Sequence, residues 1–237
     1  MRGSPACIGF STPRLNLRNH IKLLYTGSSS IESRLRDVGF IVSDKEPLLV
    51  IGVTGMPGAG KDTVREIVRE YGFPIVIMGD EVRAEAARRN IEPTPENLGK
   101  LMLQIRAEEG PEAIAKRCIS KIRALDARIV IVDGLRSPHE VREFKRVFPR
   151  FKIMAIHASP ETRFKRLLKR GRSDDPKDWE TFCARDQREL SVGIGEVIAM
   201  ADYMIVNEGM LEQLKEEIKR IIRKVIEDEQ ASGQDRS

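Results

Sequence analysis

The chain has 237 residues, of which 32% are charged and 5% aromatic, with a formal net charge of +5. This length is within the range of one α/β domain. The low aromatic content indicates an aliphatic core, and no run of basic residues interleaved with aromatics suggests a nucleic-acid platform. No apolar run reaches the ~18 residues that a membrane-spanning helix needs. We therefore expect a soluble protein with neither nucleic acid nor membrane as a partner, whose positive charge suits small phosphate-rich ligands.

The first 46 residues differ in composition from the rest. Four basic residues precede the first acidic residue, Glu32, and the segment contains several serines. This composition resembles a transit peptide, and a disordered extension or an upstream translation start explains it as well. We predict an N-terminal extension over 1–46 and a folded domain over 47–237. The three cysteines, Cys7, Cys118 and Cys183, are scattered without metal spacing, which favours free thiols in a reducing cytoplasm.

The domain begins with an apolar run, Leu48–Val53, that is rich in β-branched residues and too short for a helix. A glycine-rich segment follows, and a helical pattern with Val64, Ile67 and Val68 comes next. This strand–loop–helix order is the context of a phosphate-binding loop, where backbone N–H groups and the helix N-terminus attract phosphate. The alternative is a glycine-rich turn with a chance lysine. The predicted nucleotide-binding loop comprises Gly55, Met56, Pro57, Gly58, Ala59, Gly60, Lys61 and Asp62.

Short apolar runs then alternate with helical patterns to the end of the chain. The alternation predicts an α/β fold with a mostly parallel sheet covered by helices on both faces. Thr94-Pro95 and Ser159-Pro160 each place a capping residue before a proline at a helix start. The predicted strands are Leu48–Val53, Pro74–Met78, Arg128–Val132, Phe151–Ile156 and Tyr203–Val206.

Ligands of such sheets bind at the carboxyl ends of the strands, which singles out the polar residues there. Asp80 and Arg83 follow the second strand, and Asp133 ends the third. We expect Asp133 to act as a direct or indirect partner of Mg²⁺, or else as a turn residue before Gly134. Asp80 also suits a helix N-cap, and Arg83 also suits a solvated helix face.

A concentration of arginines lies on both sides of a Gly/Asp/Pro hinge at 171–176. Arg170 and Arg172 precede the centre of this hinge, and Arg185 lies on the helix that follows it. Guanidinium groups grip phosphate oxygens at two points, so we predict a mobile helical lid over about 166–188 that closes on phosphates. The alternative is an ordinary charged helical hairpin.

The segments GMPGAGKD, GDEVR, DGLR and RLLKRGRSDD together resemble the nucleoside monophosphate kinases, adenylate kinase above all. The ending ADYMIVNEGMLEQL is similar to that of dephospho-coenzyme A kinases. The combination is most similar to the UPF0200 family, a mainly archaeal set of adenylate-kinase-related ATPases, in which MGD-x-x-R, I-x-x-G-x-R, H-x-S-P-x-x-R and I-x-x-A-D-x-x-x-x-N-E recur. The resemblance covers about residues 48–226.

The resemblance implies a P-loop nucleotide kinase-like fold of three layers, with a five-stranded parallel sheet, a helical lid, and ATP and Mg²⁺ as cofactors. It implies that Lys61 and the lid arginines Arg170 and Arg172 act in catalysis. By the same resemblance Asn207 would lie beside the base, although turn formation before Gly209 explains this asparagine equally. The residues implied to bind the acceptor are Asp80, Arg83, Arg136 and Arg185.

Three departures from adenylate kinases bear on the function. Asp62 replaces the hydroxyl that usually binds Mg²⁺, although a carboxylate can ligate this ion directly. Arg136 comes one residue earlier than the matching arginine, and the interval from Asp174 to Arg185 is longer. The sequence therefore predicts transfer of the ATP γ-phosphoryl group to a small phosphorylated acceptor, a nucleotide or a dephospho-coenzyme A-like molecule. The alternative is a regulatory ATP-binding switch that hydrolyses ATP slowly.

Overall fold

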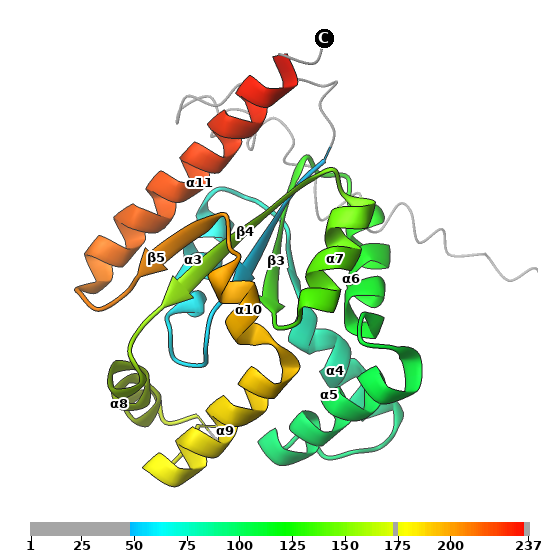
Figure 1. Ribbon diagram of the computed structural model, residues 1–237, viewed down its shortest axis with the longest axis vertical. Helices are drawn as coiled ribbons and strands as arrows, with labels where there is room; N and C mark the ends of the chain where they lie inside the picture. Colours follow the sequence, from blue (N-terminus) through cyan, green and yellow to red (C-terminus); the bar gives the residue numbers. More distant parts are fainter. Residues whose placement is uncertain (1–47, 173–174, 235–237) are drawn as a thin grey trace, which may run out of the picture. The chain divides into compact units, whose positions relative to one another are not determined.

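The computed structural model describes residues 48–172 and 175–234. The predicted N-terminal extension, 1–46, lies outside the described residues. In the described part, five parallel strands form one sheet with the order β2-β3-β1-β4-β5 (Figure 1). The strands are β1 Leu49–Thr54, β2 Ile75–Ile77, β3 Ile129–Leu135, β4 Arg150–His157 and β5 Tyr203–Val206.

Helices follow the strands along the chain and cover both faces of the sheet. One face packs on α3 and α11, which also contact each other, and α4, α6, α7 and α10 lie over the opposite face (Figure 1). The helices are α3 Lys61–Glu70, α4 Met78–Arg88, α5 Pro95–Glu109, α6 Ala113–Arg123, α7 Pro138–Val147, α8 Pro160–Arg170, α9 Trp179–Val192, α10 Ile194–Ala199 and α11 Leu211–Gln234. The predicted three-layer α/β architecture is confirmed.

Burial on both faces explains why the central strands β1 and β3 are apolar along nearly their whole length and do not alternate. All six residues of β1 are buried. Val50 belongs to the core shared with α4, α6 and α7, and Ile51, its neighbour on the strand, points to the other face. On the face covered by α4, α6 and α7, the stacked rings of Phe144 and Phe151, 5.3 Å apart, connect α7 to β4. Burial of a large aromatic side chain is worth about 1.5–3 kcal/mol.

Several predicted strand ends shift by one residue, and the end of β3 shifts by three, from Val132 to Leu135. Thr94 and Ser159 cap α5 and α8 as expected, each accepting a hydrogen bond from the backbone of the first turn. Asp80 is not an N-cap, because α4 begins at Met78 and its N-cap is Ile77. Asp133 is not a turn residue, because β3 continues past it to Leu135 and buries its side chain. Cys118 and Cys183 are free cysteines, as predicted; Cys118 is buried and Cys183 is half-buried.

All five strands run parallel, so their carboxyl ends meet at one edge of the sheet. In Figure 1 the strand arrows point toward the end of the domain where α4, α5, α8 and α9 lie. The loop between β1 and α3 and the segments after β2, β3 and β4 therefore face one another there. Within the described residues, the structure has no helix that is both long and apolar enough to cross a membrane.

Candidate functional site

The loop from Gly55 to Gly60 joins the buried strand β1 to α3, and its glycines are required by both conformation and space. Gly55 and Gly60 have φ angles of 145° and 109°, which side chains rarely tolerate. A Cβ atom on Gly55 would meet the carbonyl oxygen of Ile156, and one on Gly60 would meet the Asn207 amide. No side chain among the described residues caps α3, so its first-turn N–H groups are suited to binding an anion.

Lys61, the first residue of α3, turns its ammonium group back over the loop. Its Nζ donates to the carbonyl of Gly55 at 2.5 Å and to that of Met56 at 3.2 Å. Desolvation by burial lowers the pKa of Lys61 from 10.5 to about 8, although the charge of Asp133 opposes this shift. A lysine with this pKa is still mostly protonated at neutral pH, and phosphate would strengthen the charged form. The loop therefore holds the Lys61 ammonium group against two of its backbone carbonyl oxygens.

Asp62, which stands in place of the usual hydroxyl residue, receives three arginines. Arg65, one turn further along α3, pairs with its Oδ1 atom. From the lid, Arg170 and Arg172 reach its Oδ2 atom at 3.2 and 3.1 Å. The structure thus brings the predicted lid arginines to the loop itself, from 108 and 110 residues further along the chain.

Asp133 lies beside this cluster at the buried end of β3. Its Oδ2 atom is 3.3 Å from Nε of Arg65, so Arg65 joins the two carboxylates predicted to serve the metal. Its Oδ1 atom is buried and has no hydrogen-bond partner among the described residues. A buried carboxylate oxygen without a partner is costly unless a cation or water satisfies it. In the part of the chain that the structure describes, no three His, Cys, Asp or Glu residues are grouped to hold a metal.

The lid helices are attached to the loop by Arg163, a buried arginine of α8. Its guanidinium donates to the carbonyl of Pro57 at 3.2 Å and to Asp186 of α9 at 2.9 and 2.5 Å. It also lies over the ring of Phe182, 4.9 Å from the ring centre. Because the pair with Asp186 uses two parallel hydrogen bonds, it fixes the orientation of both helices relative to the loop.

Asn207, the residue after β5, contacts the glycine-rich loop through a hydrogen bond. Its amide nitrogen donates to the carbonyl of Ala59 at 2.8 Å, and its side-chain oxygen accepts from Arg166 at 3.3 Å. Asn207 is buried, so both contacts are sheltered from water. The structure therefore places Asn207 next to the loop, where its side chain holds the backbone of Ala59.

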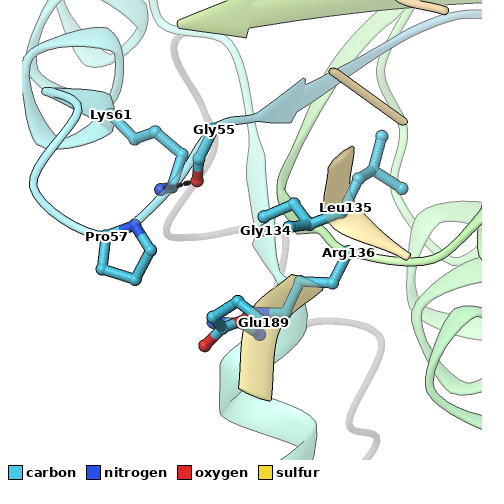
Figure 2. Close-up of a pocket in the computed structure, with 8 residues that line it drawn as sticks. Gly55, Pro57, Lys61, Gly134, Leu135, Arg136 and Glu189 are labelled. Carbon is cyan, nitrogen blue, oxygen red and sulfur yellow. Dashed lines mark hydrogen bonds and ion pairs between the residues drawn. The ribbon is translucent and has the colours of Figure 1, made fainter. Parts of the chain in front are cut away.

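A small pocket lies between the loop and the end of β3 (Figure 2). Figure 2 shows Lys61 and Pro57 on one side and Gly134, Leu135 and Arg136 on the other, with Glu189 beside Arg136. Glu189 comes from α9, and its Oε2 atom is 2.8 Å from Nε of Arg136. The charge of Glu189 raises the pKa of Arg136. Burial opposes ionisation of Glu189, but nearby positive charges, including those of Arg136 and Lys61, outweigh burial and lower the pKa of Glu189. Both groups are therefore charged.

The remaining predicted acceptor residues do not line this pocket. Arg83 pairs with Asp80 one turn earlier on α4, through Nε at 3.1 Å, and both side chains are about half exposed. Arg185 lies 3.8 Å from Asp175, a buried carboxylate that also holds Arg170. The structure thus places these residues on the α4 and α9 sides of the strand ends, each next to a carboxylate.

Sequence reasoning missed Arg65, Glu189 and Asp175 as members of this site. Arg65 had a detectable signal, because residues three apart lie on the same side of a helix. Glu189 gave none, since it acts through Arg136, which lies far from it in the chain, whereas Asp175 is only three to five residues from the arginines that it holds. Arg163 stood in a motif and had no role assigned to it.

The chain is similar in sequence to known proteins over most of its length. Residues 54–183 match the family model described as an AAA domain. A UPF0200 protein of Pyrococcus abyssi is 48% identical over 75% of this chain and 97% of its own length, and one of Hyperthermus butylicus is 50% identical over 75% and 95%. The chain belongs to the UPF0200 family.

The likeness to solved structures is one of fold. TT1252 from Thermus thermophilus matches with a TM-score of 0.50 and 18% identity, covering 76% of this chain and 98% of that one. A shikimate kinase from Acinetobacter baumannii, solved with shikimate, gives 0.49 and 17%, covering 76% and 94%. The parallel sheet, its strand order and the glycine-rich loop agree with the predicted P-loop fold.

The contacts of Asn207 generate a stability prediction. Replacing Asn207 with Ala leaves the buried carbonyl of Ala59 without a donor, so the free energy of unfolding should fall by about 1–3 kcal/mol in chemical denaturation. Asn97→Ala is the matched control, because the Asn97 amide donates to the carbonyl of Glu92 at an exposed position. Equal stability of the two variants would contradict the supporting role of Asn207.

Proposed function

We propose that this protein binds ATP and Mg²⁺ at the loop from Gly55 to Asp62 and transfers the γ-phosphoryl group to a small phosphorylated acceptor, such as a nucleotide or a dephospho-coenzyme A-like molecule. The observation that carries the proposal is the convergence of Lys61, Arg170 and Arg172 on one loop. Three cations at a helix N-terminus are suited to a group as highly charged as a triphosphate.

The residues present fit Mg²⁺. Asp133 has a buried carboxylate oxygen without a partner among the described residues, and Asp62 has a partly exposed carboxylate. Mg²⁺ is typically bound by one or two carboxylates together with phosphate oxygens, so a larger protein cage is not required. When bound, the ion would neutralise phosphate charge and help to orient the transferred group.

The protein's own residues would then act by position and charge. The loop N–H groups and Lys61 would hold the phosphates, and Arg170 and Arg172 would stabilise charge that develops on the transferring group. Arg163 would keep the lid helices in register with the loop. A phosphorylated acceptor is already anionic, so this reaction needs no general base.

A second candidate is a regulatory ATP-binding switch with slow hydrolysis and no small-molecule acceptor. One observation favours it: the predicted acceptor arginines each have a carboxylate beside them. Arg83 pairs with Asp80, and Arg136 pairs with Glu189. A switch would use such pairs to hold its conformation, whereas a kinase must release them when the acceptor binds.

Lys61 gives the proposal a pH dependence. Its pKa of about 8 means that the ammonium charge present below pH 8 is lost above it. ATP affinity, measured by calorimetry, should therefore fall by about an order of magnitude between pH 7.5 and 9. Lys61→Ala should bind ATP weakly at every pH without unfolding. An Ala variant that keeps the parent affinity would overturn the phosphate-loop assignment.

The lid arginines separate the two candidate functions. In a kinase, the Arg170→Ala/Arg172→Ala double variant should lose about 3–4 kcal/mol of transition-state stabilisation, a hundred- to a thousand-fold in rate. The measurement is single-turnover phosphoryl transfer at saturating ATP across a panel of phosphorylated acceptors. Lys165→Ala, which removes an exposed cation from the same helix, is the control. Weakened ATP binding without a change in rate would favour the switch.

A further inference from the structure

The Asp62 carboxylate is fully engaged by cations of the protein itself. Its Oδ1 atom pairs with Arg65, and its Oδ2 atom accepts from Arg170 and Arg172 at 3.2 and 3.1 Å. Arg65 also reaches Asp133. Guanidinium groups therefore occupy the positions from which a divalent cation would bind the Asp62 carboxylate, whereas Oδ1 of Asp133 has no hydrogen-bond partner among the described residues.

The two lid arginines are directed to Asp62 by Asp175. The carboxylate of Asp175 is almost fully buried and binds Arg170 through two hydrogen bonds, at 2.9 and 2.5 Å. It also accepts from the backbone N–H of Arg172 at 3.0 Å. Asp175 thus fixes the position of the segment that carries Arg170 and Arg172. The guanidinium groups of both residues then reach the Asp62 carboxylate on the loop.

A cation and three guanidinium groups compete for the same two oxygen atoms. Like charges so close together repel each other strongly, so metal binding at Asp62 requires the arginines to leave. Phosphate oxygens are good alternative partners, because guanidinium binds phosphate through charge-assisted hydrogen bonds. When metal-bound nucleotide binds, its metal ion can pair with the Asp62 carboxylate, and its phosphate oxygens can pair with the arginines that leave.

We propose that Asp62 is an exchange site that makes the loop select metal-bound over metal-free nucleotide, because the carboxylate releases Arg170 and Arg172 only when a divalent cation replaces them. The proposal rests on the proposed nucleotide site and deepens it. Metal-free nucleotide would meet both the negative charge of Asp62 and lid arginines that are already engaged. With metal-bound nucleotide, the ion would neutralise the charge of Asp62 and leave Arg170 and Arg172 free to bind phosphate.

The test is the affinity of Asp62→Asn for ATP in excess EDTA and in excess Mg²⁺, measured by calorimetry. The amide keeps the size of the side chain and removes its charge. We expect metal-free ATP to bind about five- to tenfold more tightly than to the parent, and Mg²⁺-bound ATP to bind no more tightly. An unchanged ratio between the two affinities would overturn the proposal.

Asp62→Asn would also tighten the binding of metal-free ATP if Asp62 only repelled phosphate. The Arg170→Ala/Arg172→Ala background distinguishes this cause from the release of the two arginines. If Asp62 acts by holding the arginines, the gain from Asp62→Asn should shrink to less than twofold in that background. If Asp62 only repels phosphate, the gain should grow, because the carboxylate is then less neutralised. That second result would contradict the exchange.

A measurement without nucleotide keeps this inference separate from the proposed function. Asp62→Asn should raise the hydrogen-exchange rates of the backbone amides of Arg170, Gly171 and Arg172, because the segment loses its contact with the loop. Glu161→Gln, an exposed change on α8, is the control and should not. Unchanged exchange in Asp62→Asn refutes the contact itself, whereas faster exchange in a protein that binds no ATP would refute the proposed function alone.

Discussion

The site depends on the buried guanidinium group of Arg163. It is the point at which the loop after β1, the start of α8 and the middle of α9 are joined, through Pro57, Ala158 and Asp186. A buried arginine is costly unless every donor finds a partner, and here the carboxylate, the two carbonyls and the ring of Phe182 provide them. This anchor holds the two lid helices against a loop more than a hundred residues earlier in the chain.

Around Arg163, several arginines of the site are paired with carboxylates. Because the arginines at the strand ends face carboxylates, part of their positive charge is neutralised within the protein. Phosphates that bind there must take over guanidinium groups from carboxylates. The pairs are Arg83 with Asp80, Arg136 with Glu189, Arg170 with Asp175, and Arg172 with Asp62. Such exchange ties the arrangement of the lid to the charge of the ligand, which suits both a kinase and a switch.

The sequence predicts the fold well because the fold follows local patterns. Five apolar runs became five strands, and Thr94 and Ser159 became helix caps. The loop was predictable because strand, glycines and lysine are adjacent in the chain. The ion pairs of Asp62 with Arg170 and Arg172 were not, because they join distant segments whose side-chain directions depend on tertiary packing.

Tertiary packing also decides two details that the sequence does not show. Asn207 was expected beside the base or in a turn, and its buried contact with Ala59 depends on where β5 ends relative to the loop. Asp133 was expected at the end of a strand, whereas β3 extends two residues further because Thr54 and Leu135 remain paired beside it. Neither position is encoded in the residues immediately around it.

The most direct test of the account is a crystal structure of the protein with a non-hydrolysable ATP analogue and Mg²⁺. We predict that the β- and γ-phosphates lie against the N–H groups of the loop from Gly55 to Asp62, with Lys61 in contact with them. Arg170 and Arg172 should have moved from Asp62 to phosphate oxygens. Phosphates bound elsewhere on the domain would contradict the account.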